Sequence, residues 1–382
     1  MLSRIEIVRS VEEAAAPWRR LEAHALASPF QSYRWLEAWS RLVAPHRDET
    51  PLLVLGFDAR DEPVLLLPFA TSSTQGATVL SWLGQEHQTY AMGLYAPEVV
   101  GSLSADVLRD ILDRVVAVAP GISSLNLTNQ PAVWLGQPNP FLALGGQENA
   151  NRSHQLQLTG DFEGQVLRAL KKHTRGKLRR SLAALQALPG YALDLGDGPS
   201  QRAALLESFL DQKARQLADK GIPNPFGAPE LQRFYRDLAE ASGERESLLE
   251  CQGIRIAGEA IATSMSVTCH GQRHLLTLSL GTGDPALLKL SPGLSLIHLS
   301  IAQATADAIA LYDFGAGEGQ HKAMWQPAAV PLFDTYLPLS LRGYAVSLAA
   351  ASGSLAKRII KNNRPLWQAA QSMRRILNAK RR

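Results

Sequence analysis

The stretch that decides the fold runs from residue 288 to residue 325 and reads LKLSPGLSLIHLSIAQATADAIALYDFGAGEGQHKAMW. A Ser-Pro-Gly turn begins it, and Ser291 and Pro292 are residue types that helices favour at the N-cap and at the first helical position. Apolar residues then recur on one helical face, and the apolar segment 310–314 has the length of a short strand. The sequence therefore predicts a turn, a helix and a strand, followed by a polar loop.

This turn also has the features of an anion site. A helix that begins after a tight turn leaves its first backbone N–H groups without acceptors, and such groups suit an anion such as a pyrophosphate. An ordinary loop-to-helix cap is the simpler explanation of the turn considered alone. The order of the elements around the turn favours the binding site.

The composition is that of a globular protein without disulfides. The chain has 382 residues, enough for two domains, and 46% of them are hydrophobic. Its two cysteines, Cys251 and Cys269, cannot form a disulfide framework or a zinc site, and no Walker or Rossmann pattern occurs. The N-terminal residues lack a signal-peptide core, and no stretch is long and apolar enough to span a bilayer. We therefore expect a cytoplasmic protein with no metal site.

Two parts of the chain show the same order of predicted elements. Each reads as two helices, three antiparallel strands, a helix and a strand, with turn-forming residues between the strands. The sequence therefore predicts a duplication of one α/β unit. The first set is 12–27, 33–43, 52–57, 64–70, 78–83, 104–119 and 122–127; the second is 201–219, 229–241, 248–251, 254–267, 274–280, the helix after Ser291 and 310–314.

A strongly basic segment lies between the two sets. The pattern from 162 to 188 predicts one long helix, capped by Thr159 or Asp161 and ended by a Pro-Gly pair. Four basic residues, three or four positions apart, share one face of it without an intervening acid. Their mutual repulsion favours an anionic partner, although a charge run is usually a solvated surface. The four are Arg168, Lys172, Arg175 and Arg179.

The C-terminal tail is basic as well. No acidic residue follows Asp334, whereas lysines and arginines recur to the end of the chain. Such a tail suits contact with a membrane surface, RNA or an acidic partner, or it is simply a solvated terminus. We expect no DNA binding, and we expect truncation at Gly353 to leave the melting temperature nearly unchanged.

Five motifs, taken in order, resemble one family of enzymes. They are SPFQSYRWL at 28–36, VLLLPF at 64–69, LKKHTRGKLRR at 170–180, LSPG at 290–293, and DFG at 313–315 with Lys322 and Trp325 after it. This set resembles the CelD-like acetyltransferases of the GNAT superfamily, a family associated with cellulose or exopolysaccharide biosynthesis. The resemblance covers roughly residues 28–335.

The resemblance implies an α/β (α+β) fold of two tandem GNAT-like units, as in the FemABX aminoacyl transferases. Each unit is then a mostly antiparallel mixed sheet flanked by helices, and a basic helical tail follows. The expected bounds are 1–147, 148–340 and 341–382. The second unit is the one expected to carry the acyl-donor site.

In the GNAT pattern, acyl-CoA lies between the fourth and fifth strands, here 274–280 and 310–314. Its pyrophosphate is held at the start of the following helix. The resemblance therefore implies acetyl-CoA or another acyl-CoA as co-substrate, with no permanently bound cofactor. The donor site carried over to this chain consists of Leu278, Leu280, Lys289, Ser291, Pro292, Gly293 and Leu294.

Acyl transfer needs a base for the nucleophile, stabilisation of the carbonyl oxygen and a proton for the leaving thiol. Glu318 and His321 are the candidate bases, and histidine titrates near neutral pH. Lys322 would hold an anionic substrate or polarise the carbonyl, and Asp313 would orient the other groups. We expect Glu318, His321 and Lys322 to be accessible on one loop; a purely structural Asp313–Lys322 ion pair is the alternative.

The acceptor is expected to be a small molecule or glycan, and an anionic one if the basic helix binds it. The expected function is transfer of an acetyl or acyl group to an amine or hydroxyl of a sugar or exopolysaccharide precursor. Two alternatives stay open: a FemABX-like aminoacyl transferase that uses charged tRNA, and a non-catalytic binding module of acyl-CoA or of polysaccharide machinery. The candidate acceptor contacts are Lys172, Arg175, Arg179, His87 and Tyr90, of which the last two also suit a structural role.

Overall fold

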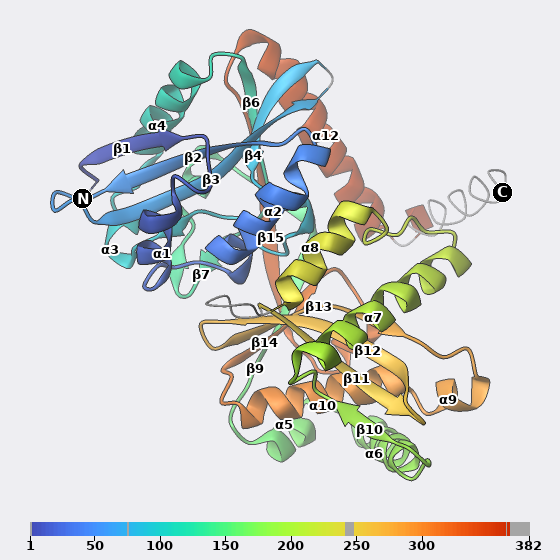
Figure 1. The fold of residues 1–382 in the computed structure, drawn as a ribbon. Coiled ribbons are helices and arrows are strands. Elements are labelled where there is room, and N and C mark those ends of the chain that lie inside the picture. Colours follow the sequence, from blue (N-terminus) through green and yellow to red (C-terminus); the bar gives the residue numbers. More distant parts are fainter. Residues whose placement is uncertain (1, 75, 241–247, 364, 367–382) are drawn as a thin grey trace. The chain divides into compact units, whose positions relative to one another are not determined.

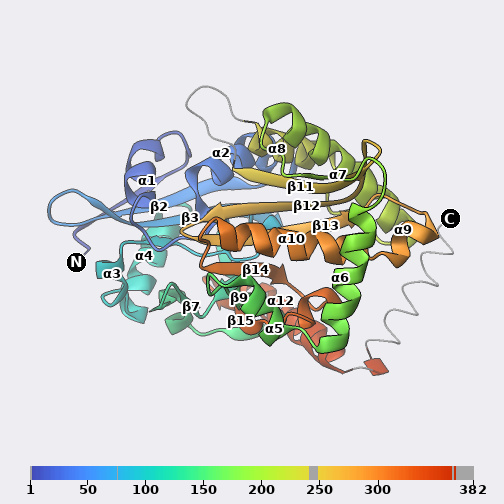
Figure 2. The same ribbon diagram turned by 90° about the horizontal axis from the view of Figure 1, so that it is seen from below.

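The computed structural model describes residues 2–74, 76–240, 248–363 and 365–366, which form two compact units. Unit 1 contains the described residues up to Arg152 and those from Pro331 onward, and unit 2 contains those between Ser153 and Val330. Both units show the predicted order of two helices, three antiparallel strands, a helix and a strand (Figures 1 and 2). The domain bounds expected from the sequence, 1–147, 148–340 and 341–382, stay a prediction.

Unit 1 is a mixed sheet with the strand order β1-β2-β3-β4-β6-β15. The β4–β6 pair is parallel, and the other pairs along this order are antiparallel. Strand β3 is an apolar run because α1 and α2 cover one face of the sheet and α4 and α12 the other (Figures 1 and 2). The elements are β1 (Arg4–Val8), α1 (Ala15–Glu22), α2 (Tyr33–Leu42), β2 (Thr50–Phe57), β3 (Pro63–Thr74), β4 (Ala77–Trp82), β5 (Leu94–Tyr95), α3 (Pro97–Val100), α4 (Ala105–Val118), β6 (Ile122–Pro131), β7 (Val133–Trp134), β8 (Gln137–Pro138), β15 (Ala328–Pro338) and α12 (Leu341–Asn362).

Unit 2 repeats this design with the strand order β9-β14-β13-β12-β11-β10, in which the β13–β14 pair is parallel. Neighbouring residues of β12 face opposite ways: Thr263 donates to Gln212 of α7, whereas Ala262 packs with α10. Helices α7 and α8 therefore cover one face, and α10 with α5 and α6 covers the other (Figures 1 and 2). The elements are β9 (Gln147–Gln157), α5 (Phe162–Ala169), α6 (Lys172–Gln186), β10 (Ala192–Asp194), α7 (Pro199–Asp219), α8 (Pro229–Ala239), β11 (Leu249–Ile256), β12 (Glu259–Cys269), β13 (Gln272–Leu280), α9 (Pro285–Lys289), α10 (Pro292–Ala306), β14 (Leu311–Ala316) and α11 (Gln320–Ala323).

The single helix predicted from 162 to 188 is wrong, because the chain forms two helices, α5 and α6. Asp161 caps α5 by accepting the Gly164 N–H, but the backbone becomes extended at Leu170. The guanidinium of Arg175 donates to the carbonyls of Leu167 and Leu170, which stabilises the end of α5. The basic residues of the predicted face are consequently divided between two helices.

The strand boundaries in the second meander also differ from the prediction. The turn predicted at Ala257–Gly258 is confirmed, with positive φ at both residues, whereas the turn predicted at 252–253 is wrong because β11 continues through it. Two such residues form the tight turn that joins antiparallel strands. Gly253 lies within β11, where the close approach of α7 requires a glycine: a Cβ there would be 2.6 Å from a methyl group of Leu205.

Helix α12 contacts unit 1 beyond the residue where the tail was expected to become dispensable. Ser354 donates to the carboxylate of Asp334 at 2.8 Å, and Arg358 donates to the Glu148 carbonyl at 3.3 Å. None of the helices in the described part of the chain has both the length and the hydrophobicity of a membrane span. Tail residues from 367 on lie outside the described residues, so contact with a membrane surface or RNA stays a prediction.

Truncation after Gly353 is therefore expected to destabilise the protein. Loss of the Ser354 and Arg358 hydrogen bonds should lower the free energy of unfolding by about 1–2 kcal/mol. Denaturant titration of the truncated and full chains measures this, with Ser354→Ala reporting the share of the hydroxyl. An unchanged unfolding midpoint would restore the expectation that the tail is dispensable.

Candidate active site

Strands β13 and β14 are neighbours at their start and then separate. Their parallel pairing extends from Gln272–Leu311 to His274–Asp313. Beyond that point β14 pairs with β9, while β13 continues along β12. The recorded β12–β13 register skips Leu276, which makes a bulge of the kind that bends a strand and redirects its groups.

The middle of β13 is partly exposed where the strands have separated. Leu276, Thr277 and Leu278 are half-buried, whereas Leu275 and Ser279 on either side are buried. A strand covered by helices on both faces is normally buried along its length. The exposure of these three residues therefore marks an opening between the carboxyl ends of β13 and β14.

The start of α10 lacks a side-chain cap. Ser291 is the N-cap residue, as predicted, but it has left-handed backbone angles, φ 52° and ψ 53°, and its hydroxyl makes no capping bond. The N–H groups of Leu294 and Ser295 donate to its carbonyl, and Pro292 has no N–H. Among the described residues no acceptor is recorded for the Gly293 N–H, and no acid lies in the first turn. This end of α10 is therefore suited to an anion.

The opening of β13 and the start of α10 lie against each other. A Cβ on Gly293 would be 3.1 Å from a methyl carbon of Leu278 and 3.1 Å from one of Leu280. Leu294 is half-buried in the adjoining apolar cluster, and Lys289 is exposed at the end of α9. The residues expected to hold the donor thus occupy neighbouring elements; their role remains a proposal.

The corresponding region of unit 1 is built differently. The hydroxyl of Ser104 caps α4, and Asp106 places a negative charge in its first turn. The side chain of Gln85 accepts the Thr128 N–H at 3.1 Å and donates to the Asn126 carbonyl at 3.4 Å. These two backbone groups of β6 are therefore already hydrogen-bonded. An anion at this helix start would meet a capped N–H and a carboxylate.

His321 lies on the loop after β14, in α11, and is half-buried. Burial lowers the pKa of its imidazole below the usual 6.5, and the positive charges of Lys322 and Lys213 lower it further. The imidazole is therefore neutral at neutral pH, which is the form that accepts a proton.

Lys213 of α7 was not expected from the sequence. Its ammonium donates to the Leu278 carbonyl at 3.0 Å, and burial, with a smaller effect of Lys220, lowers its pKa to about 8. Helical spacing could have predicted its position, because Lys213 follows the buried Leu206 and Phe209 by seven and four positions and so shares their face of α7. A lysine on an apolar stripe is unusual, because lysine is seldom buried without a partner.

Asp313 is buried in the sheet, and its expected role of orienting the catalytic groups stays a prediction. It is 0% exposed, and its carboxylate accepts from the Ser153 hydroxyl at 2.9 Å and from the Gly315 N–H at 2.6 Å. Its second oxygen accepts from the Gln155 amide and lies 3.8 Å from His274 Nδ1. A carboxylate so placed stabilises the last parallel pair of β13 and β14.

Of the other expected loop residues, Glu318 is accessible but Lys322 is not. The Glu318 side chain is 69% exposed, with one carboxylate oxygen 3.4 Å from His154 Nε2. Lys322 is 8% exposed, and its ammonium donates to the carbonyls of Gly315 and Ala316 at 2.9 and 3.1 Å. Lys322 therefore stabilises the end of β14, and its expected contact with substrate is not supported.

The variant Lys322→Met tests this structural role. It would leave the carbonyls of Gly315 and Ala316 without a charged donor, so the free energy of unfolding should fall by about 2 kcal/mol. Lys177→Met, on an exposed position of α6, is the control and should be neutral. Equal denaturation midpoints for both variants would contradict the role assigned to Lys322.

The two residues of unit 1 expected to contact the acceptor both lie against a tryptophan ring, and the expected contact of His87 stays a prediction. Tyr90 is 0% exposed, and its ring lies 4.7 Å from that of Trp134, so its predicted contact with acceptor is wrong. His87 is half-buried with its ring 5.6 Å from Trp39, and burial lowers its pKa.

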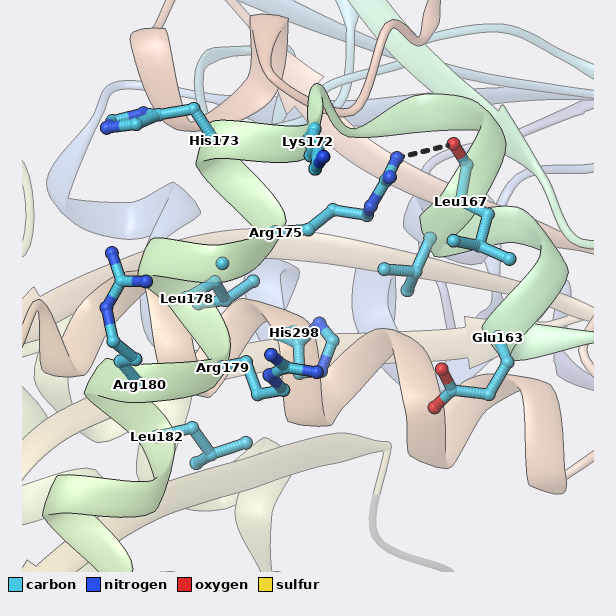
Figure 3. A pocket seen from close by; sticks show the side chains of 12 residues that line it. Glu163, Leu167, Lys172, His173, Arg175, Leu178, Arg179, Arg180, Leu182 and His298 are labelled. Atoms are coloured by element: carbon cyan, nitrogen blue, oxygen red, sulfur yellow. Dashed lines mark hydrogen bonds between the residues drawn. The ribbon is translucent and has the colours of Figure 1, made fainter.

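On α6, Lys172 and Arg179 are exposed and line a cavity of about 890 Å³, together with Arg175 (Figure 3). Arg175 is already bonded to the carbonyls of Leu167 and Leu170, so it is less free to hold substrate than expected. Within the described residues, no group of three His, Cys, Asp or Glu side chains is placed to hold a metal ion.

Comparisons with known proteins agree with this geometry. The family described as Acetyltransferase (GNAT) domain matches residues 172–323, which include α6, β13, α10 and the loop of His321. No curated protein sequence matches the chain. Three solved structures resemble the fold at identities that establish only the fold. FemX matches with a TM-score of 0.62 and 10% identity, over 90% of this chain and 100% of FemX. A conserved protein of unknown function from Bacteroides thetaiotaomicron matches with a TM-score of 0.54 and 11% identity, over 87% of this chain and 100% of that one. The C-terminal domain of a putative lysylphosphatidylglycerol synthetase from Agrobacterium fabrum matches with a TM-score of 0.52 and 11% identity, over 90% of this chain and 96% of that one.

The matched segment contains the separating strands, the uncapped helix start and the neutral histidine. The fold is a mixed α/β GNAT-like fold, as expected, and it occurs in both units. GNAT domains use acyl-CoA as co-substrate, which suits an open helix start in unit 2. Residues 172–323 therefore resemble a GNAT acetyltransferase domain in both sequence and fold, and this match supports an acyltransferase.

Proposed function

We propose that unit 2 binds acyl-CoA where β13 and β14 separate and transfers its acyl group to an amine or a hydroxyl. The observation that carries this proposal is the opening at Leu276–Leu278 beside the uncapped start of α10. The pantetheine arm would extend along the exposed part of β13, and the pyrophosphate would accept the Gly293 N–H. The capped helix and the Asp106 carboxylate of unit 1 support assignment of the donor to unit 2.

In this proposal two side chains move protons. The neutral imidazole of His321 takes the proton of the attacking amine or hydroxyl as the new bond to the carbonyl carbon forms. In this proposal, backbone N–H groups at the Leu276 bulge would stabilise the carbonyl oxygen. When the C–S bond breaks, Lys213 donates a proton to the leaving thiolate, for which a pKa of about 8 is well matched.

The acceptor class rests on the CelD-like resemblance and on charge. We propose a sugar amine or hydroxyl of an exopolysaccharide precursor, since the family motifs at 28–36 and 170–180 are both present. The exposed Lys172 and Arg179 support an anionic acceptor. Likeness of fold to FemX supports no particular acceptor or donor, so aminoacyl transfer remains an outcome to be tested.

Native mass spectrometry of the purified chain, followed by calorimetry with acetyl-CoA, tests the donor. A co-purified CoA species, or one acetyl-CoA bound per chain, supports the proposal. Absence of acetyl-CoA binding, together with loss of activity after RNase treatment, would replace acyl-CoA by charged tRNA. Binding of acetyl-CoA with no acylated product from any amino sugar or polysaccharide precursor would favour a binding module.

A further inference from the structure

A groove lies between α5 and α6 in unit 2, and α10 closes its base (Figure 3). Its volume of about 890 Å³ is sufficient for an organic ligand of ordinary size. The proposed acyl transfer uses only the positive charge of Lys172 and Arg179 in this groove, as attraction for an anionic acceptor, and assigns no ligand to its apolar part. The side chains that line it are Glu163, Val166, Leu167, Lys172, His173, Arg175, Leu178, Arg179, Arg180, Leu182 and His298, together with Gly176.

Part of the groove is apolar and accessible. Val166 and Leu178 are buried members of the core beneath it, and Leu182 is half-buried at its side. Leu167 on α5 is 60% exposed at its rim. A large leucine this exposed beside further apolar side chains is a surface that a partly apolar ligand would cover.

The α6 wall of the groove is cationic. Figure 3 shows Arg175 and Arg179 directed toward α5, whereas His173 and Arg180 point away from it; Lys172 also lines the groove, at the start of α6. Glu163 is the acidic residue among those that line the groove. Arg175 is bonded to two carbonyls of the α5 end, so Lys172 and Arg179 are the cations best placed to meet a ligand.

A polar atom also lies at the base of the groove. His298 Nδ1 is buried and has no hydrogen-bond partner among the described residues. The imidazole ring stacks on Trp325, with ring centroids 6.0 Å apart, and lies tilted against Phe162 at 4.9 Å. A buried nitrogen without a partner is costly, by about 1–3 kcal/mol, so a hydroxyl or phosphate oxygen of a ligand would be favoured there.

We propose that the α5–α6 groove binds an anionic amphiphile, a phosphate monoester with a single apolar chain. The phosphate lies between Lys172 and Arg179, and the chain covers Leu167, Leu178 and Leu182. An RNA or a nucleotide fits less well, because the lining residues include no Phe, Tyr or Trp on which a base would stack. The proposal is independent of acyl-CoA binding at α10.

Calorimetry with dodecyl phosphate, below its critical micelle concentration, tests the proposal. We expect binding of one molecule per chain, and at least tenfold weaker binding of dodecyl maltoside, which has the same chain without the charge. Inorganic phosphate alone should also bind at least tenfold more weakly. Equal affinity for the maltoside would show an apolar patch only, and equal affinity for inorganic phosphate would show a simple anion site; either result overturns the proposal.

A matched pair of variants tests whether dodecyl phosphate binds in the groove. Lys172→Glu should weaken dodecyl phosphate binding at least tenfold, whereas Lys177→Glu, an exposed lysine of the same helix outside the groove, should change it less than twofold. Leu182→Ser should weaken binding through the apolar wall alone. Equal losses in the two lysine variants would mean attraction by net charge and would refute the site. Acetyl-CoA binding should be unchanged in all three, which separates this result from a failure of the proposed acyl transfer.

Discussion

Replacement of Gly293 by valine is expected to weaken acetyl-CoA binding about 100-fold. A β-branched side chain at this position would press on methyl groups of Leu278 and Leu280 that already lie 3.1 Å from an added Cβ. It would also cover the N–H to which the pyrophosphate is assigned. A hydrogen bond between an N–H and a charged group contributes about 1.5–3 kcal/mol, which corresponds to about a 10- to 150-fold change in affinity. Calorimetric titration with acetyl-CoA measures the loss.

Two further variants make this result interpretable. Gly293→Ala should show an intermediate loss, because its single methyl group requires only a small movement of the two leucines. Ser291→Ala should bind normally and melt near the wild-type temperature, because the Ser291 hydroxyl makes no capping bond. If Gly293→Val is folded by circular dichroism and binds acetyl-CoA as the wild type does, the donor site lies elsewhere.

The second large effect concerns His321. Its replacement by glutamine should lower kcat by about 100- to 1,000-fold, because general-base catalysis contributes a factor of this size. The dependence of activity on pH tests the role of His321 more specifically. Burial and two neighbouring lysines lower the imidazole pKa, so the active, neutral form persists below pH 6.5. Activity of the wild type should fall only when the pH falls through that lowered pKa.

The acid limb of the profile should therefore lie below pH 6.5 in the wild type and disappear in His321→Gln. Glu318→Gln is the matched comparison, since Glu318 lies three residues away and its side chain is largely exposed. We expect it to retain activity within about threefold of the wild type. A larger loss in Glu318→Gln than in His321→Gln would transfer the role of base to the carboxylate.

Much of the fold could be predicted from local patterns. The α7 and α8 helices begin and end within two residues of their predicted bounds, and α10 begins at the predicted Pro292, because apolar spacing and proline positions mark them. Strand β14 was predicted for the same reason, and so was the repeated order of elements. The break between α5 and α6 was missed, because it is stabilised by the Arg175 guanidinium rather than by a proline or glycine at the break.

The site was predictable in position more than in detail. Residues 278–294 and 313–322 do lie around the separating strands, because the turn before α10 and the end of β14 carry local signals. The roles within that region depended on burial. From the sequence, Asp313 and Lys322 were predicted to be catalytic because the sequence shows that they are charged but does not show that they are buried.

Periodicity and turn chemistry, which act between residues a few positions apart, were sufficient to specify the order of helices and strands and the helix start at Gly293. Contacts between distant residues decided which polar groups are available for chemistry. Ser153 and Gln155 of β9 enclose Asp313, and α7 brings Lys213 to Leu278 of β13. Burial and pKa depend on such contacts, since both are properties of the surroundings of a side chain after folding rather than of the side chain itself.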